Sequence, residues 1–434
     1  MLSVDIVEKI SRYKNEPLWM RNLRKKAFYY FQKLPMPKWG PSLDIDFEKI
    51  NYFVPRVRKP KRVWEAVPED LKRYFEKIGI PDAEKKFLAG VELQFDSSVV
   101  YGNIRKKLEE QGVIFMDTDT ALKKYEDIFK KYFGKLVPYT DNKFAALNTA
   151  FWSGGSFIYI PPYTKVSMPL HAFFRMETAQ FGQFERTLII VDKGAEAEYL
   201  EGCTAPLEFS YSLHAAVVEV YVKKGARFKY STMQNWSRNI YNLVTKRSLV
   251  EDNATMQWVD VNVGSKVTMK YPSCILKGEN ARGIIFSLAM ADKGQNQDTG
   301  TKMIHLGENT RSLVVTKAIS KNGGINEYRG LIDIGKNATE STSNVSCDAL
   351  LLDSKSKAGT KPVNYLRNAE SKIYHEATIS QLDDYKTYFL RARGMKSFDV
   401  KMAVVSGFVD EVVKKLPLEF SAEFDKLLEF LLEE

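Results

Sequence analysis

A thiol, an imidazole and a carboxylate stand near the end of a long strand-like part of the sequence. Cys347 precedes His375 by 28 residues, and Glu376 follows His375 directly. These three side chains suit iron or zinc as ligands. They also fit a hydrolase triad, but that chemistry needs a nucleophile elbow or an oxyanion loop, and the sequence has no GxSxG or equivalent. The meaning of the 28-residue gap depends on the elements that carry Cys347 and His375.

The region from about 155 to 380 has the pattern of strands and turns. Short runs rich in Val, Ile, Tyr, Phe and Thr alternate with Gly, Asn and Asp. A turn signature, usually Gly or Asn followed by a small residue, recurs with that small residue at positions 195, 226, 254, 281, 310, 338 and 369. Its period of 27 to 31 residues is typical of a solenoid. A β-sandwich also has regular turns, but its strands return every 8–12 residues. We therefore favour a parallel β-helix.

In such a fold, one period of sequence becomes one step between neighbouring coils. Paired strands lie about 4.8 Å apart, so His375 is expected beside Cys347, whereas Glu376 points the opposite way on an ideal strand. Counting from the turns places six residues in one column: Cys203, Gln234, Asn262, Ala289, Ala318 and Cys347. Five coils would put the two thiols about 24 Å apart. The column either lines an internal passage or is ordinary tight packing, because buried cysteine behaves as a small hydrophobe.

Helical patterns flank this core. We expect a mainly helical region over 1–154, the β-helix over 155–380 and a helical region over 381–434. The individual helices are expected over 19–34, 67–79, 117–133, 383–394, 400–416 and 423–434. The last helix has one apolar face, formed by Phe424, Leu427, Leu428, Leu431 and Leu432. That face needs a partner, which is either the rest of this chain or another subunit.

Composition narrows the classes of function. The 434 residues carry a net charge of +10, but the sequence shows no basic stripe interleaved with aromatic residues, so nucleic acid is not an expected partner. No apolar run approaches the ~18 residues of a membrane span. Asp5 and Glu8 interrupt any signal peptide, and the three cysteines include no CxxC, so a cytoplasmic protein without disulfides is expected. Without GxxxxGK[ST] or GxGxxG, the chain is not expected to hydrolyse ATP itself.

Several stretches of the sequence resemble the SufB family, the scaffold subunits of the SUF iron–sulfur cluster assembly machine. They include KNEPLWM, DNKFAALN, GQFERTLI, EGCTAP, KYPSCILKGENARG, DTGTKMIHLGENTRS, HEAT and KLPLEF. The resemblance implies a right-handed parallel β-helix flanked by helical regions. It also implies an assembly scaffold rather than an enzyme, with a transient iron–sulfur cluster as its product.

Partners follow from the same resemblance. The C-terminal helices are expected to dock a SufC-type ABC ATPase, which hydrolyses the ATP and gives the apolar face at 424–432 its partner. The end of the β-helix is expected to meet the paralogue SufD or a second copy of this chain. A sulfur donor protein is a further expected partner. Flavin binding is a theme of the family, but the sequence shows no flavin motif.

The resemblance also assigns roles to individual residues. Cys347 would be the cysteine on which the cluster is built, with His375 and Glu376 beside it at a subunit interface. Cys203, in EGCTAP, would accept sulfur from the donor. The internal route between the two thiols would involve Arg175, Gln234, Trp236 and Lys246. Cations such as Arg175 or Lys246 are expected to lower the thiol pKa values, since the thiolate is the reactive form.

Two alternatives stay open on the sequence. A SufD-like structural partner is one, although SufD has Gly after its histidine and generally lacks the EGC context. SufB members commonly carry a glutamate before the histidine, where this chain has Tyr374, so ligation by a second carboxylate is in doubt. A β-helix polysaccharide lyase or hydrolase is the other, but it needs paired carboxylates along a groove, and none stand at suitable positions.

Overall fold

The computed structural model describes residues 2–55, 57, 60–62, 64–67, 69, 88–205, 211–382 and 384–433. The helix expected over 67–79 lies, apart from residues 67 and 69, outside them. None of the helices in the described part of the chain has the length and apolar character of a membrane span.

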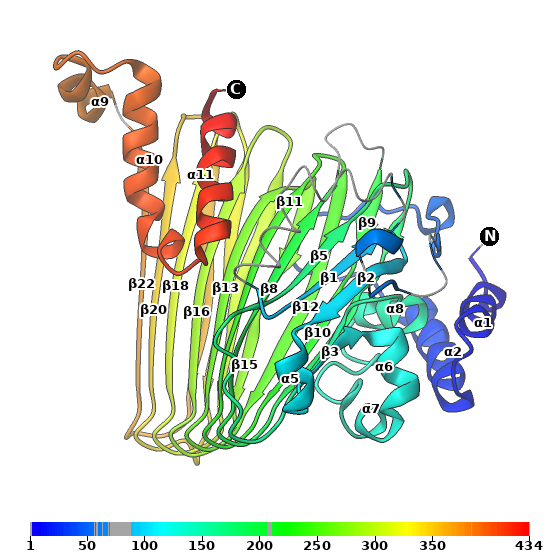
Figure 1. The fold of residues 1–434 in the computed structure, drawn as a ribbon. Helices are drawn as coiled ribbons and strands as arrows, with labels where there is room; N and C mark the ends of the chain where they lie inside the picture. Colours follow the sequence, from blue (N-terminus) through cyan, green and yellow to red (C-terminus); the bar gives the residue numbers. More distant parts are fainter. Residues whose placement is uncertain are drawn as a thin grey trace.

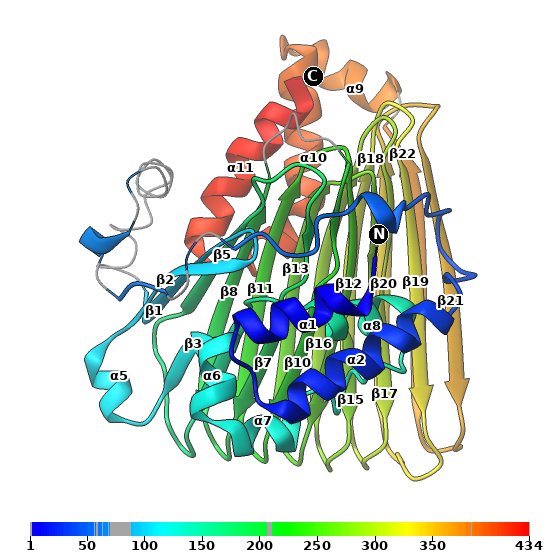
Figure 2. The ribbon, with the colours of Figure 1, turned by 90° about the vertical axis from the view of Figure 1, so that its right-hand side faces the viewer.

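The core is a parallel β-helix of about eight coils, which confirms the expected architecture (Figures 1 and 2). One wall is a ten-stranded sheet in the order β2-β1-β5-β8-β11-β13-β16-β18-β20-β22. Its strands are β1 (Gly90–Phe95), β2 (Ser98–Ile104), β5 (Leu170–Arg175), β8 (Glu196–Thr204), β11 (Arg227–Trp236), β13 (Thr255–Gly264), β16 (Arg282–Ala291), β18 (Arg311–Ser320), β20 (Thr342–Leu351) and β22 (Lys372–Gln381).

The second wall is a twelve-stranded sheet whose main path is β21-β19-β17-β14-β12-β10-β7-β4-β3. Its strands are β3 (Ile114–Asp117), β4 (Ser156–Ile160), β6 (Gly182–Gln183), β7 (Arg186–Val191), β9 (Ser212–His214), β10 (Val217–Val222), β12 (Ile240–Val250), β14 (Val267–Lys270), β15 (Ser273–Leu276), β17 (Asn296–His305), β19 (Ile325–Ile334) and β21 (Lys357–Leu366). The pairs β1–β2 and β3–β4 are antiparallel, and the other named pairs are parallel. Strands within the N-terminal 154 residues therefore begin both walls.

Side chains alternate between the interior and the outer faces, as the two-residue period of a strand requires. In β13 the inward positions hold Met256, Trp258, Asp260 and Asn262, and these residues are buried. Parallel register then places one inward residue of each strand beside one of the next. We call such a series of register partners a file.

The repeated turn signature marks one row of corners. Gly194, Gly225, Asn253, Asn280 and Asn309 all have positive φ there, between 50° and 68°, a region that favours glycine and asparagine. The small residues that follow are buried, for example Ala226 and Ala254 at 0 % exposure, so neighbouring coils can stack closely. Asn337 and Asn368 do not have positive φ, which shows that the last two corners have a different conformation.

Helices cover the outer faces of the two sheets, which Figure 2 shows from the side of the N-terminal helices. The first group is α1 (Val4–Tyr13), α2 (Leu18–Lys33), α5 (Lys106–Glu110), α6 (Thr118–Lys124), α7 (Glu126–Tyr132) and α8 (Lys143–Phe151), with short 3-10 turns at Phe47–Lys49 and Trp64–Ala66. The C-terminal group is α9 (Asp384–Arg391), α10 (Ser397–Val413) and α11 (Leu418–Glu433). The single helix expected over 117–133 is two helices, α6 and α7, separated at Tyr125 (φ −127°).

The apolar face at 424–432 packs within the chain, so its assignment to a partner subunit was wrong. Phe424 and Leu428 are at most 1 % exposed and belong to a cluster with Leu288 and Val261 on the outer face of the ten-stranded sheet. Figure 1 shows α10 and α11 lying against that face. The expectation failed because an amphipathic pattern gives the apolar side of a helix without naming what covers it.

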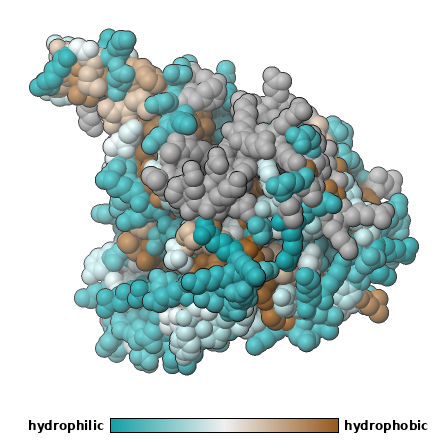
Figure 3. Space-filling view, in the orientation of Figure 1, coloured by the Kyte–Doolittle hydropathy of each residue, from teal (hydrophilic) through white to brown (hydrophobic). Residues whose placement is uncertain are grey.

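The short helix α9 projects from this layer and exposes aromatic side chains. Tyr385, Tyr388 and Phe389 are 71 %, 65 % and 45 % exposed. Figure 3 shows apolar residues mixed with polar ones on the projecting end. Among the C-terminal side chains whose burial is described, the exposed aromatic ones therefore lie on α9.

The last coil leaves the β-helix open. β21 and β22 are the edge strands of the two sheets, and many of their side chains are exposed on both faces. Large apolar residues lie among them: Val363, Tyr365, Leu366, Tyr374 and Ile379 are 44–55 % exposed. Because Leu366 and Ile379 occupy inward positions, the interior of the coil is uncovered at this end.

Candidate functional site

Cys347 and His375 lie side by side on the last two strands of the ten-stranded sheet. The distance from Cys347 Sγ to His375 Nε2 is 3.8 Å. The register partner of Cys347 is Ala377, and that of His375 is Val345, so the two residues are diagonal neighbours on the same inward face. Cys347 is buried, whereas His375 is partly exposed at the open end. The sequence gap thus predicted the contact correctly.

Glu376 does not join this pair. It is exposed, its register partner is Ser346, and it lies on the opposite face of β22 from His375. Among the described residues, no three His, Cys, Asp or Glu side chains form a group that could hold a metal ion. Of the three predicted ligands, only Cys347 and His375 therefore lie together within one chain.

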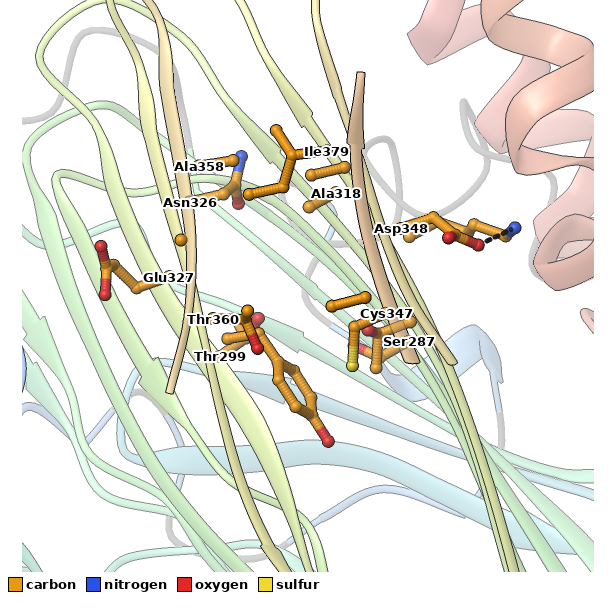
Figure 4. Close-up of a pocket in the computed structure, with 16 residues that line it drawn as sticks. Ser287, Thr299, Ala318, Asn326, Glu327, Cys347, Asp348, Ala358, Thr360 and Ile379 are labelled. Atoms are coloured by element: carbon orange, nitrogen blue, oxygen red, sulfur yellow. Dashed lines mark hydrogen bonds and ion pairs between the residues drawn. The ribbon is translucent and has the colours of Figure 1, made fainter. Parts of the chain in front are cut away.

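A small cavity of about 30 Å³ lies beside Cys347. Figure 4 shows Cys347 and Ser287 on one wall, Thr299 and Thr360 across from them, and Asp348 pointing away. Tyr328 also lines the cavity, and its phenol hydroxyl lies 2.7 Å from the Thr301 hydroxyl.

The Cys347 thiol is held in its protonated form. Burial raises the pKa of Cys347 to about 11, although hydrogen bonds with Thr316 and Tyr328 act in the opposite direction. The expectation of a thiol pKa lowered by a nearby cation was wrong at Cys347. In its place, two hydroxyl groups contact the sulfur.

Cys203 is also a buried thiol. It is 3 % exposed, and Gln234 Nε2 lies 3.9 Å from its sulfur. Burial, with the carboxylates of Glu201 and Glu185 nearby, raises the pKa of Cys203, and the ammonium of Lys246 offsets this only in part. The expected net lowering was therefore wrong here as well, even though Lys246 acts in the expected direction.

Arg175 points to a different partner. Its Nε lies 2.7 Å from Glu177 Oε1, and its register partner is Thr204 rather than Cys203. Because Thr204 and Cys203 face opposite sides of β8, Arg175 does not lie on the inward file of Cys203.

A charged cluster lies in the interior between the two cysteines, and of its members only Lys246 was expected from the sequence. Lys246 lies 3.4 Å from Asp260 and 3.7 Å from Glu201, and Lys270 lies 2.8 Å from Asp260. The Tyr230 hydroxyl donates a hydrogen bond to Glu201. These groups are buried, and burial lowers the pKa of Lys270 to about 8. Polar residues at inward positions of otherwise apolar strands were the available signal.

The predicted column is correct for its first five members only. Cys203, Gln234, Asn262, Ala289 and Ala318 follow one another in register. The next member is Ala349, not Cys347. Cys347 instead lies on the neighbouring file, which holds Glu201, Thr232, Asp260, Ser287 and Thr316 before it and Ala377 after it.

The cause is the length of one corner. Seven residues, 335–341, connect β19 to β20, whereas five residues, 306–310, connect β17 to β18. The strands β18 and β20 are consequently offset by 31 residues, because Arg311 pairs with Thr342. The file that contains Cys347 could therefore not be located by counting from the turn signature.

Gln234 and Trp236 lie at inward positions near Cys203. The Gln234 carbonyl oxygen accepts a hydrogen bond of 2.8 Å from Asn242, which also contacts His214 at 2.7 Å. The Trp236 ring lies over His214, with 4.7 Å between the ring centroids. His214 contacts Glu185 at 2.8 Å. Cys203 is thus the end of a buried polar network.

The fold and these sites define a β-helical protein with two buried thiols joined by a polar interior, one of them beside a histidine at an open end. A family model described as "SUF system FeS cluster assembly, SufBD core domain" matches residues 174–408, and one described as "SufBD protein N-terminal region" matches 90–172. The chain belongs to this SufBD family of iron–sulfur cluster assembly proteins.

Curated relatives agree with the family models. The iron–sulfur cluster assembly protein SufB of Bacillus subtilis (strain 168) is 51 % identical over 433 residues, which is 100 % of this chain and 93 % of the relative. An iron–sulfur cluster assembly SufBD family protein of Staphylococcus aureus (strain MRSA252) is 50 % identical over the same shares of the two chains. These matches therefore favour an iron–sulfur cluster assembly protein over a polysaccharide-active enzyme as the interpretation of this β-helix.

Proposed function

We propose that this chain is the scaffold on which iron and sulfur are joined into a transient cluster. The observation that carries the proposal is the 3.8 Å contact between Cys347 and His375 at the open end of the β-helix. A thiolate and an imidazole are both good iron ligands. Two protein ligands suit a cluster that must later leave, because the remaining positions can exchange.

In this mechanism Cys203 receives sulfur as a persulfide from a donor protein. The sulfur then moves through the polar interior, where Gln234, Lys246 and Trp236 lie near the start of the route. It would reach Cys347 as a persulfide, where an external two-electron reductant would release it as sulfide to ferrous iron while His375 completes or exchanges the iron ligands. Because burial raises the pKa of both thiols, the thiolates form only when the interior is locally rearranged or an incoming cation binds.

Glu376 would join the cluster site only when a second subunit binds to this chain. It lies on the outer face of an edge strand, where a neighbouring subunit can approach. The exposed apolar residues of β21 and β22 are the kind of surface that a second β-helix would cover, either a SufD paralogue or another copy of this chain. The cluster would then form at the subunit interface, as the resemblance implies.

A SufC-type ATPase would dock on the C-terminal region. Since the apolar face of α11 is already buried, the exposed aromatic residues of α9 are the better docking surface. Tyr385, Tyr388 and Phe389 have the aromatic character that interface centres favour. ATP hydrolysis in the partner would then move α9 and α10, and through them the wall of the β-helix.

Anaerobic reconstitution tests the scaffold. The wild-type chain with its ATPase partner, ferrous iron and sulfide should turn brown and show sulfur-to-iron charge-transfer absorption. Cys347→Ser and His375→Ala should lose most of this absorption, whereas Cys274→Ser, at a buried thiol outside the proposed route, should keep it. Normal cluster yield in Cys347→Ser would contradict the proposal and would favour a structural role like that of SufD.

A further inference from the structure

A cavity of about 230 Å³ lies on the outer face of the twelve-stranded sheet, the face over which α2 and α8 lie in Figure 2. Pro37 and Trp39, from the segment that follows α2, line one side of it, and Phe144 of α8 also contributes. The remaining lining residues come mainly from β12, β14, β15 and β17. The cavity is therefore on the opposite side of this wall from the interior that holds the buried thiols.

An interruption of the sheet forms the floor of this cavity. β12 pairs with β14 through Tyr241–Val244 and with β15 from Arg247 onwards. Between β14 and β15 the chain passes through Pro272, which cannot donate a ladder hydrogen bond. Thr245 and Lys246 therefore have no register partner on that side, and both line the cavity. The interruption makes a hollow in a face that is otherwise a continuous sheet.

Two cations lie on one outward file across this floor. Arg247 pairs in register with Ser273, and Ser273 pairs in turn with Lys302. Two strand spacings put the backbones of the two cations about 9.6 Å apart. Long cationic side chains at that separation can contact one oxyanion together, with the serine hydroxyl between them. All three residues line the cavity.

The one carboxylate among the described lining residues is already engaged. Asp141 Oδ1 lies 2.8 Å from Arg247 Nη1, which also donates a hydrogen bond of 2.7 Å to the Leu136 carbonyl. Lys302 forms no ion pair within the part of the chain that the structure describes, and its ammonium lies 5.8 Å from the centroid of the Tyr271 ring. Burial lowers the pKa of Lys302, and the charge of Arg247 acts in the same direction. A bound anion would oppose both effects.

Aromatic rings flank the charged floor. Trp39 is 47 % exposed, and the residue after it packs directly on the sheet. Gly40 has φ +82°, and a Cβ there would lie 2.7 Å from the Met269 methyl group. The Tyr271 hydroxyl donates a hydrogen bond of 2.6 Å to Asp298, which holds the second ring in place. Flat apolar walls beside two cations suit a ligand that combines an aromatic ring with an oxyanion.

We propose that this cavity binds a small aromatic oxyanion, which is a carboxylate or a phosphate ester carried on one ring system. Lys302 and Arg247 hold the oxyanion, and Trp39 covers the ring. The volume is below the range of about 300–1,000 Å³ typical of pockets for drug-sized ligands, so the ligand is smaller than a dinucleotide. The proposal depends neither on the thiols nor on cluster assembly.

Isothermal titration calorimetry of the full chain tests the site with two probes, naphthoate and naphthyl phosphate. At least one probe should bind with a stoichiometry of one. It should bind at least tenfold more tightly than naphthamide, which keeps the ring, and than inorganic phosphate, which keeps the charge. The tighter probe shows whether the site prefers a carboxylate or a phosphate ester. Absence of binding by both probes at millimolar concentration would overturn the proposal.

Variants test whether the probe binds in this cavity. Lys302→Gln should weaken binding of the tighter probe at least tenfold, whereas Lys302→Arg keeps the charge and should stay within threefold of wild type. Trp39→Ala should weaken it at least fivefold. Lys336→Gln, at an exposed position in the loop after β19, is the matched control and should stay within twofold.

The Tm of Lys302→Gln separates lost binding from lost folding. It should not fall, because this lysine has no ion pair to lose and is penalised by burial. Wild-type affinity in Lys302→Gln would refute the site, and wild-type affinity in Trp39→Ala alone would refute the aromatic wall.

Discussion

At the scale of single residues, the proposed cluster chemistry depends on polar side chains at inward positions where a β-helix normally has apolar ones. Cys347 and His375 could be paired from the sequence because one repeat separates them. Lys270, Asp260 and Tyr328 could not, because a polar residue within a strand gives no sign of which charge it will meet inside. Only the register of several strands brings such residues together.

Buried histidines should make the stability of this protein depend on pH. Burial lowers the pKa of His171 to about 4, and the ring packs against Phe420 at 5.6 Å. As pH falls below about 6.5, His171 binds a proton in the unfolded chain but not in the folded one. The free energy of unfolding therefore decreases as pH falls from about 6.5 towards 4.

For this residue the loss at pH 5 is about 2 kcal/mol relative to pH 8. His171→Phe should remove that part of the pH dependence. Guanidinium chloride unfolding midpoints at pH 8 and pH 5 measure it, and an equal drop in the variant and wild type would show that His171 does not contribute.

At the scale of elements, the repeat signature predicted the strands and five of the corners, because positive φ restricts the choice of residue. It failed at the corner of residues 335–341, since a longer loop carries the same Asn-Ala pair in another conformation. The helix over 117–133 was overestimated because periodicity continues across the break at Tyr125.

The corner glycines give a graded prediction. Gly225 has φ +68°, and a Cβ there would meet nothing closer than 4.0 Å. Gly225→Ala should therefore cost only the backbone term, about 1 kcal/mol, and Gly225→Asn should cost less.

By contrast, a Cβ at Gly264 would lie 1.8 Å from the Trp236 carbonyl oxygen. Gly264→Ala should accordingly be far more destabilising than Gly225→Ala. Thermal melts of the three variants test the order, and a Gly264→Ala protein as stable as wild type would contradict it.

At the scale of the whole molecule, the β-helix has unlike ends. The first coils are covered by antiparallel strands and helices, whereas the last coil exposes its interior, where the partly exposed His375 lies beside the buried Cys347. Length and period predicted the solenoid, but neither tells which end is left open or which helix face stays free. Those properties depend on how distant segments pack.

The open end should be an association surface. Ile379 is 49 % exposed at an inward position of β22, so Ile379→Lys would place a charge in the uncovered interior. Association with a second β-helix subunit should weaken at least tenfold, measured by size-exclusion chromatography with light scattering. Tyr163→Lys, 66 % exposed away from this end, is the control. An unchanged molecular mass for Ile379→Lys would place the interface elsewhere.

The seven-residue corner before β20 has a consequence for how such β-helices change over time. The length of each loop sets the register of the strand that follows it. A longer loop therefore shifts that whole strand relative to its neighbour, although the residues of the strand stay the same. An insertion in a surface loop can thereby move a thiol to a different file of inward residues. Loop lengths should then diverge together with reactivity among related solenoids, even where their buried residues are identical.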